Sequence, residues 1–288
     1  MAVETRGKDL IWVMNQRDAI DEMLPSLQGT LRKSAVNIRL TETGLLVSRS
    51  LELARLYSKY KNWNEVKQRW HESRVASRGT RGSAQRVFKN LKARFQAGGR
   101  PLPPMADLPV VLDSCETTRD QAQILYFYLI CSDALFRYVL HELLSEGLQY
   151  GVLDVNTDSV LDKLRRFEFV GGEGLSYADS TLRRWVNGLQ SVLREVGIIG
   201  GKYSHKGVPP AIGEVPMLVS ATFSWQKFGS EWVNKPVGWI YLYQPQETQQ
   251  SLFKRLSQLD SWNVDQNQRG YSVEPASKPF EWVSRLTN

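Results

Sequence analysis

The most constraining feature of the sequence is a run of apolar residues that recur at steps of three and four within Ser180–Val196. On a helix these residues share one face, and Arg183, Arg184 and Asn187 lie on the opposite face. Gly197 follows and can end the helix. The apolar face consists of Leu182, Trp185, Val186, Leu189, Val192, Leu193 and Val196. Because such a face must be covered, the chain is expected to be a packed helical protein.

The same spacing, together with capping residues, predicts further helices along the chain. Leu31–Leu40 alternates apolar and polar residues, so it is either a short strand or an irregular arm. The expected helices are Asp9–Leu24, Thr43–Tyr60, one that begins at Asn62 or Asn64, one capped by Ser83 that runs to about Ala97, Thr117–Glu146 as one long helix or a pair, Asp158–Phe167, Ser180–Val196 and Ser251–Leu259.

A proline-rich segment divides the sequence. Arg100-Pro101-Leu102-Pro103-Pro104 cannot continue a helix, because proline lacks the amide donor and restricts the residue before it. We therefore predict a basic helical nucleic-acid-binding domain over residues 1–100 and a second helical domain over residues 106–288. Met217–Trp225 and Val237–Tyr243 are rich in β-branched and aromatic residues. The fold class is thus mainly α, with two packed helical domains and room for a small β wing or hairpin in the C-terminal part.

Positive charge is concentrated near the N-terminus. The chain carries a net charge of +7, yet residues 1–100 hold 20 Lys and Arg against 9 Asp and Glu, and the remainder is slightly acidic. The segment Arg74–Arg100 contains eight basic residues and no Asp or Glu. Positive charges that are close together repel one another, and an anionic partner such as nucleic acid relieves this repulsion. The alternatives are an acidic protein partner or a solvated helix face without a function.

This segment supplies the candidate DNA contacts. On a helix from Ser83, apolar residues such as Val87 and Leu91 group on one side, and Arg86, Lys89, Asn90 and Lys92 group on the other. The two glycines and hydroxyls of Arg78-Gly79-Thr80-Arg81-Gly82-Ser83 suit phosphate binding at a helix start. The candidate DNA-binding residues are Arg74, Arg78, Arg81, Ser83, Arg86, Lys89, Lys92 and Arg94, with Arg183 and Arg184 as a second surface.

The second surface has the outline of a winged helix-turn-helix. The Ser180–Val196 helix carries its arginines and is followed by Gly197–Tyr203, a glycine-rich stretch that could turn back as a wing. A packing helix with exposed arginines explains the pattern equally well.

Several kinds of chemistry are excluded. Cys115 and Cys131 have neither disulfide nor zinc spacing, which favours a reducing, cytoplasmic location. Gly200-Gly201-Lys202 lacks the hydroxyl residue of a phosphate-binding loop, and Glu65-Val66-Lys67, although spaced like a nuclease motif, sits in a helical run. Ile124–Leu144 is apolar but contains four polar ionisable residues, so it is expected to be a core helix and not a membrane span. We therefore expect no enzyme, no catalytic residue, no cofactor, no metal and no membrane.

Two other functions remain open. A protein-interaction scaffold could use the basic face for an acidic partner and the tryptophan-rich tail as a buried contact. A helical RNA-binding module is the other option, since basic helices serve both polymers.

The order of these features resembles the BrxA family of bacteriophage-exclusion (BREX) defence systems. The resemblance spans about Thr41 to Gly200 and rests on helix patterns. The segments that carry it are Leu45–Tyr57 with its Leu-Glu-Leu-Ala-Arg-Leu-Tyr, Asn62-Trp63-Asn64-Glu65-Val66, Arg78–Phe95, Ile124–Leu144, and Ser180-Thr181-Leu182-Arg183-Arg184 running to Leu193-Arg194-Glu195-Val196-Gly197-Ile198-Ile199.

The resemblance implies a mostly helical DNA-binding accessory protein that contacts double-stranded DNA and works beside a defence methyltransferase and ATPase. It also implies that Arg81, Ser83, Arg86 and Arg94 match the family's basic helix, and that Thr181, Arg183 and Arg184 match its C-terminal helix. The chain departs from the family in length, because a tail with five tryptophans continues beyond the region of resemblance. These are Trp225, Trp232, Trp239, Trp262 and Trp282.

Overall fold

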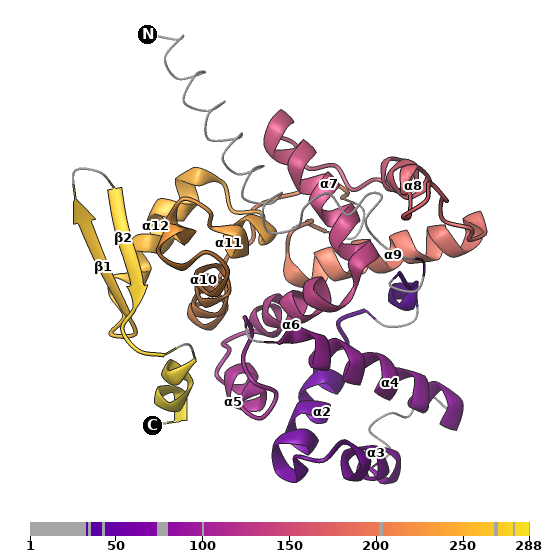
Figure 1. Cartoon of the computed structure of the whole chain (residues 1–288), viewed down its shortest axis with the longest axis horizontal. Coiled ribbons are helices and arrows are strands. Elements are labelled where there is room, and N and C mark those ends of the chain that lie inside the picture. The colour runs from indigo at the N-terminus through magenta and orange to yellow at the C-terminus, as the bar shows by residue number, and fades with distance from the viewer. Residues whose placement is uncertain are drawn as a thin grey trace.

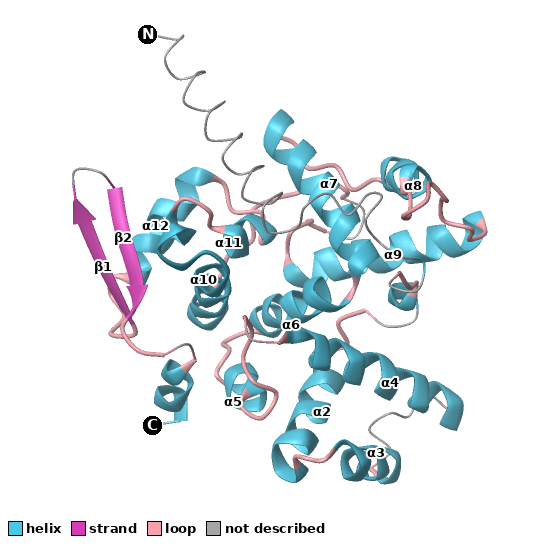
Figure 2. Cartoon of the chain, in the orientation of Figure 1, coloured by secondary structure: helices cyan, strands magenta, loops and turns pink. Residues whose placement is uncertain are grey.

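The computed structural model describes residues 33, 36–41, 44–73, 80–99, 101–201, 204–267, 270–278 and 280–287. The predicted helix Asp9–Leu24 lies outside these residues. The described chain is mainly helical, as predicted (Figures 1 and 2). Its elements are the 3-10 helix η2 (Arg39–Thr41), α2 (Val47–Tyr60), α3 (Trp63–Glu72), α4 (Arg81–Gly98), α5 (Leu108–Asp113), α6 (Thr118–Ser132), α7 (Ala134–Tyr150), α8 (Thr157–Arg166), α9 (Asp179–Val196), α10 (Glu214–Phe228), η3 (Gly229–Val233), α11 (Val237–Tyr241), α12 (Gln246–Leu256), β1 (Trp262–Asn267), β2 (Gly270–Pro275) and η4 (Glu281–Thr287).

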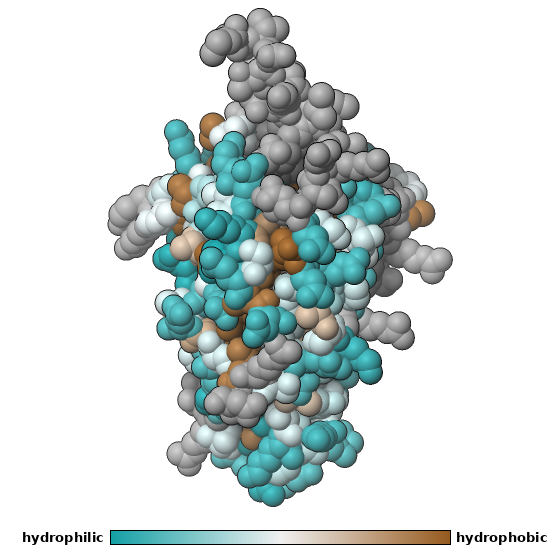
Figure 3. All heavy atoms as spheres, turned by 90° about the vertical axis from the view of Figure 1, so that its left-hand side faces the viewer, coloured by the Kyte–Doolittle hydropathy of each residue, from teal (hydrophilic) through white to brown (hydrophobic). Residues whose placement is uncertain are grey.

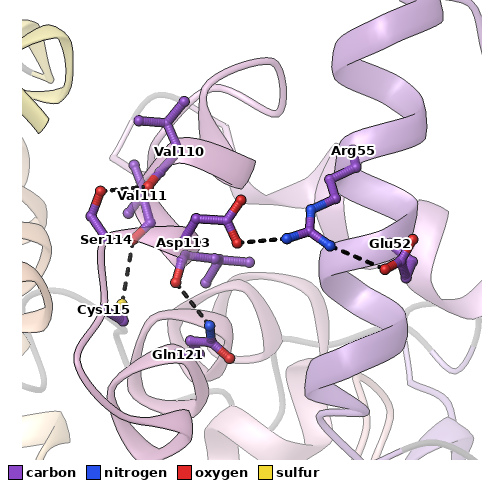
Figure 4. A network of polar contacts seen from close by, with 9 residues as sticks. Glu52, Arg55, Val110, Val111, Asp113, Ser114, Cys115 and Gln121 are labelled. Atoms are coloured by element: carbon purple, nitrogen blue, oxygen red, sulfur yellow. Dashed lines mark hydrogen bonds and ion pairs between the residues drawn. The ribbon is translucent and has the colours of Figure 1, made fainter. Parts of the chain in front are cut away.

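Helices α2, α3 and α4 pack together at one end of the molecule (Figure 1). Asn62 caps α3, since its side chain accepts from the backbone N–H groups of Asn64 and Glu65. A polar network joins α2 to α5, in which Arg55 lies 2.8 Å from Asp113 and 3.1 Å from Glu52 (Figure 4). These side chains are half exposed, so the two ion pairs should contribute little to the free energy of unfolding, and of the two only the Arg55–Asp113 pair connects α2 to α5.

The predicted Thr117–Glu146 segment is a helix pair. Thr117 opens α6 with a capping box, in which its hydroxyl accepts from the Asp120 N–H and the Asp120 carboxylate accepts from the Thr117 N–H. Asp133 then separates α6 from α7 and caps α7 by accepting from the Phe136 N–H at 3.0 Å. Within the described residues no single helix could cross a membrane. Only α6 and the Ala134–Gly147 part of α7 reach that length together, across a bend of 110°.

The tail differs from the prediction. Met217–Trp225 and Val237–Tyr243, which we expected to favour strands, lie mostly in α10 and α11. In α10 the hydroxyls of Ser220, Thr222 and Ser224 donate to backbone carbonyls four residues earlier, so these polar groups are satisfied inside a buried helix. The β-branched residues serve packing here, because tertiary burial outweighs a weak local preference.

The predicted β hairpin exists, but further along the chain. Strands β1 and β2 pair antiparallel, with Val264 opposite Val273 and Trp262 opposite Pro275. Trp232 lies beneath this hairpin and donates from its indole Nε1 to the Val273 carbonyl at 2.7 Å. The hairpin therefore covers the tail core.

Four of the five tail tryptophans are buried: Trp232, Trp239, Trp262 and Trp282. The rings of Trp232 lie 5.3 Å from Trp239 and 5.5 Å from Trp262, and Phe253 fills the same cluster. Figure 3 shows that hydrophilic residues cover most of the described surface on the side of the hairpin, with hydrophobic residues in small patches between them. These tryptophans are core residues and are not available to a partner in this conformation.

The buried apolar residues of both predicted domains form one cluster that runs from Val36 to Val283. The most extensive contact between the two predicted domains is that of α4 with α6. There Gly98 passes against the Tyr128 ring so tightly that a Cβ would lie 2.6 Å from it, and Phe95 meets the same ring edge to face at 5.3 Å. The α4 helix is thus anchored at its C-terminal end.

Candidate nucleic-acid interface

Helix α4 carries most of the predicted contacts and contains no acidic residue. Its N-cap is Thr80, which has an extended backbone and whose side-chain Oγ1 accepts from the Ser83 N–H at 3.2 Å. We predicted Ser83 as the cap. It is instead the third residue of the helix and only partly exposed, because the helix begins two residues earlier. Arg74, Arg78 and Arg100 lie outside the described residues.

The two faces of α4 separate largely as predicted. Val87, Phe88, Leu91 and Phe95 are buried, and Arg81, Arg86 and Lys89 are exposed. The 3.6-residue repeat of the helix accounts for this separation. The first half of the helix therefore presents cations to solvent.

Lys92 is half-buried. Its ammonium group lies 5.2 Å from the centroid of the Trp63 ring, a cation–π distance. Trp63 comes from α3 and also contacts Phe88 edge to face at 6.2 Å. Trp63 was not predicted as part of this face, because only the packing of α3 on α4 brings it there.

Arg94 does not belong to the exposed set. It is only 4% exposed, and its Nη1 donates to the carbonyls of Gly44 at 3.0 Å and Leu45 at 3.5 Å. Burial lowers the Arg94 pKa to about 10, and the carboxylates of Asp133 and Glu195 oppose that shift. It stays protonated at neutral pH. Arg94 thus ties α4 to the chain before α2 and is not placed to meet a phosphate.

Asn90 is a second correction. We expected it on the solvent side, but it is 8% exposed and turned toward Arg94 and Asp133, with which it lines a small polar cavity of about 20 Å³. Burial also raises the Asp133 pKa to about 6. Residues 36–41 cover this side of α4, so its exposed face is narrower than a lone helix would suggest.

Helix α9 belongs to a unit with winged-helix connectivity. Antiparallel bridges join Asp154 to Lys206 and Ile199 to Gly207. The supporting bonds run from the Val155 N–H to the His205 carbonyl at 2.8 Å and from the Val208 N–H to the Ile198 carbonyl at 2.7 Å. The unit thus has three short extended segments. The first follows α7, the second follows α9, and the third pairs with both of them. Helices α8 and α9 lie between the first and second segments. This is the order of a winged helix-turn-helix, and residues 202–203 of this stretch lie outside the described residues.

The predicted arginines of α9 are exposed, and acidic residues lie near them. Arg183 lies 3.8 Å from Asp158, at the start of α8. Arg165 of α8 in turn lies 3.0 Å from Asp179, the first residue of α9. Arg184 and Asn187 are exposed beside them. The α9 face is therefore mixed in charge, in contrast to α4.

The wing and the helix are also tied together. Arg194 donates from Nε to the Gly201 carbonyl at 3.2 Å. Gly197 ends α9 with a φ of 89°, and its N–H donates toward the carbonyls of Leu193 and Arg194. Gly207 lets the returning segment approach Leu153, where a Cβ would lie 2.6 Å away. These contacts set the wing against the helix.

The two candidate helices share one support. Both α4 and α9 pack against α6, and in Figure 1 they lie on opposite sides of it. Arg94 of α4 and Glu195 of α9 approach the same segment, since Arg94 donates to the Gly44 carbonyl and a Cβ on Gly44 would lie 3.5 Å from the Glu195 carboxylate. The connection between the two units is thus made of buried or half-buried groups.

Taken together, these elements define a class: a helical protein that combines a three-helix unit bearing a basic helix with a winged-helix unit. Comparison with family models identifies the family. The BrxA model matches residues 36–214, which is more than half of the chain. The chain belongs to the BrxA family, and this family is one of BREX phage defence. Most of α10 and all of α11–η4 lie beyond the matched residues.

Searches of curated proteins and of solved structures found no match for the chain.

Proposed function

We propose that this protein is a non-catalytic DNA-binding accessory protein of its defence system, and that α4 contacts the phosphate backbone of double-stranded DNA. The observation that carries the proposal is the face of α4, which exposes Arg81, Arg86 and Lys89 and belongs to a helix without an acidic residue. Cations on one face bind phosphates and release condensed counterions. The affinity should therefore be high at low salt and fall steeply as salt rises.

The start of α4 supports the same role. Its first turn contains Arg81, and the positive end of a helix dipole favours a phosphate. No acidic residue lies in that turn. A phosphate at this end would meet both the dipole and a guanidinium.

The winged-helix unit supplies a second contact in this proposal. Arg184 and Asn187 are exposed on α9, and arginine and asparagine are the side chains that pair best with guanine and adenine edges. Because acidic residues lie close to Arg183, this unit is suited to reading a groove more than to general attraction. The α4 face then provides affinity, and α9 provides orientation.

A mobility-shift titration of duplex DNA against salt tests the proposal. The test variant is Arg81→Gln with Lys89→Gln, and it should bind about tenfold more weakly at low salt and show a smaller salt slope. Arg81 occupies the first turn, where a cation opposes the helix dipole, so its loss does not weaken the helix. A loss of affinity would therefore report on DNA contacts.

The matched control removes two exposed cations from elsewhere, Lys254→Gln with Lys278→Gln. This variant has the same net charge as the test variant and should keep most of the affinity. Equal losses in both variants, or no binding by the wild-type chain at low salt, would overturn the proposal.

The two other functions are outcomes of the same experiments. Burial of four tail tryptophans removes the main support for a scaffold that docks through them. A chain that ignores DNA and co-purifies with another protein of the system, such as its methyltransferase or ATPase, would restore the scaffold hypothesis. Competition by structured RNA that exceeds competition by duplex DNA would favour an RNA-binding role.

A further inference from the structure

A pocket of about 230 Å³ lies where four segments meet. Ala97 and Pro101 contribute the end of α4 and the loop after it, Ile130 contributes the end of α6, Arg137 comes from α7, and Phe223 and Lys227 come from α10. None of these residues is among the predicted DNA contacts. The pocket is therefore separate from the α4 face and from the wing.

Two cations and no acidic residue are found among the described residues that line the pocket. Lys227 is exposed at its rim. The guanidinium of Arg137 is fixed, because its Nη1 donates to the carbonyls of Ile130 at 3.0 Å and Cys131 at 3.2 Å. Two like charges converge here without a counter-charge in the wall, an arrangement that an anion would stabilise.

Unused hydrogen-bonding groups accompany these charges. The Arg137 Nε is buried and has no hydrogen-bond partner in the described chain. The Tyr241 hydroxyl, which interacts electrostatically with Arg137, is also buried without a partner there. Buried polar groups are normally satisfied, so these two groups show that the surroundings of Arg137 are short of acceptors, although Tyr241 itself does not line the pocket.

Cys131 does not cancel the positive charge. Burial raises the pKa of its thiol to about 11, although Lys227 and Arg137 both act to lower it. The thiol is therefore neutral at physiological pH. The rest of the wall is formed by apolar surfaces of Ile130, Pro101 and Phe223.

We propose that this pocket binds a small organic anion, whose carboxylate or phosphate group lies between Arg137 and Lys227 and whose apolar body lies against Ile130 and Pro101. The volume is below the roughly 300–1,000 Å³ of pockets for drug-sized ligands, so the body is about one ring in size. The site is independent of the proposed DNA binding. Because α4 ends at its rim, an occupant would also hold the end of that helix.

Ligand-observed NMR on the full chain tests this site with three probes of one size. Benzoate and phenyl phosphate carry the two head groups, and benzyl alcohol is the neutral counterpart. We expect saturation transfer to both anions and little to the alcohol. Benzyl alcohol binding as tightly as benzoate would overturn the proposal, because the charges would then have no role.

Two variants locate the binding. Lys227→Gln removes one exposed charge and should weaken benzoate binding by about tenfold, the effect of one charge-assisted contact. Ala97→Leu fills the rim and should abolish binding, whereas Ala93→Leu, one turn earlier on α4 and outside the lining, should not. Circular dichroism confirms that each variant is folded.

Unchanged benzoate binding in Ala97→Leu would show that the anion binds elsewhere and would refute the assignment. The Lys227→Gln variant should shift DNA as the wild-type chain does. This second readout distinguishes a failure of the pocket from a failure of the proposed DNA binding.

Discussion

Arg94 and Lys89 are close in sequence on the same helix, yet their surroundings differ completely. Lys89 is exposed, whereas Arg94 is buried and donates to two carbonyls of the chain before α2. A charge in the first setting is free to meet an external phosphate. A charge in the second setting is committed to the fold, since its removal leaves buried acceptors and the Asp133 carboxyl without their partner.

Replacing Arg94 should therefore act on stability. We expect Arg94→Ala to lower the free energy of unfolding by about 3 kcal/mol, the cost of breaking a buried charged contact. Lys89→Ala, the control on the exposed face, should change it by less than about 0.5 kcal/mol. Urea denaturation followed by circular dichroism measures both. Equal effects of the two substitutions would contradict the burial of Arg94.

Asp133 should make stability depend on pH. Burial raises its pKa to about 6 from an ordinary 3.8, so the folded state binds the proton more tightly than the unfolded state does. Its favourable contribution is complete below about pH 4 and is lost as the pH rises through 6. The change amounts to about 3 kcal/mol for a shift of this size.

Asp133→Asn isolates this effect, because asparagine also caps helices well and does not titrate. The free energy of unfolding of the variant, relative to the wild type, should rise by about 3 kcal/mol between pH 4 and pH 7. Denaturant titrations at several pH values provide the comparison. A difference that stays constant over this range would show that Asp133 titrates normally.

At the scale of elements, the segment of residues 36–41 is held against α9 by a glycine. Leu40 is buried, and a Cβ on Gly188 would lie 2.6 Å from the Leu40 carbonyl oxygen. That oxygen belongs to the backbone and cannot move aside as a flexible side chain could. The approach of η2 to α9 thus depends on Gly188.

Two glycine substitutions should have opposite effects for this reason. Gly188→Ala should destabilise the protein by about 1–3 kcal/mol through overpacking, although alanine favours helices. Gly82→Ala, in α4 where no described atom beyond the neighbouring residues and the backbone of the same helix lies within 4 Å of the new Cβ, should stabilise it by up to about 1 kcal/mol. Thermal unfolding measures the two signs, and hydrogen exchange of residues 36–41 should rise only in Gly188→Ala. A stabilised Gly188→Ala would disprove the close contact.

Helix periodicity predicted those elements whose burial is one-sided. The predicted Ser180–Val196 helix differs from α9 by one residue, because Trp185 and Leu189 face the core while Arg183 faces solvent. In α10 the pattern fails, since that helix is buried on nearly all sides and its β-branched residues carry no periodic signal.

The sequence predicted the exposure of a side chain in the candidate site only where the helix repeat alone determines it. The exposure of Arg81, Arg86 and Lys89 follows from the helix repeat. The burial of Asn90 and Arg94 does not, because residues 36–41, Gly44 and Asp133, distant in sequence, cover them. Local sequence shows which side of a helix is apolar, but it does not show which other segment covers a polar residue.

At the scale of the whole molecule, the buried residues of the two predicted domains form a single cluster. The join includes Gly98 against Tyr128, where no side chain could be inserted between α4 and α6. Separate domains usually meet through smaller and more polar surfaces. The buried cluster therefore continues past the prolines that follow α4.

Core substitutions on the two sides should accordingly act on one unfolding transition. Leu91→Ala in α4 and Leu189→Ala in α9 each remove a fully buried side chain, which costs about 2–5 kcal/mol. Calorimetry should show both variants melting in one peak at a lower temperature. Two peaks, each shifted by only one of the substitutions, would instead show that residues 1–100 and 106–288 unfold independently.

The contact of Lys92 with Trp63 gives the molecule an optical property. Because an ammonium group lies 5.2 Å from that indole, the emission of Trp63 depends on where the lysine is. The other tryptophans at the tail core are shielded from such changes by burial. A polyanion that draws Lys92 away would alter the fluorescence of Trp63, whereas the four buried tail tryptophans would not respond directly. The fluorescence of Trp63 is therefore an intrinsic, label-free signal beside the face of α4 that we propose binds DNA.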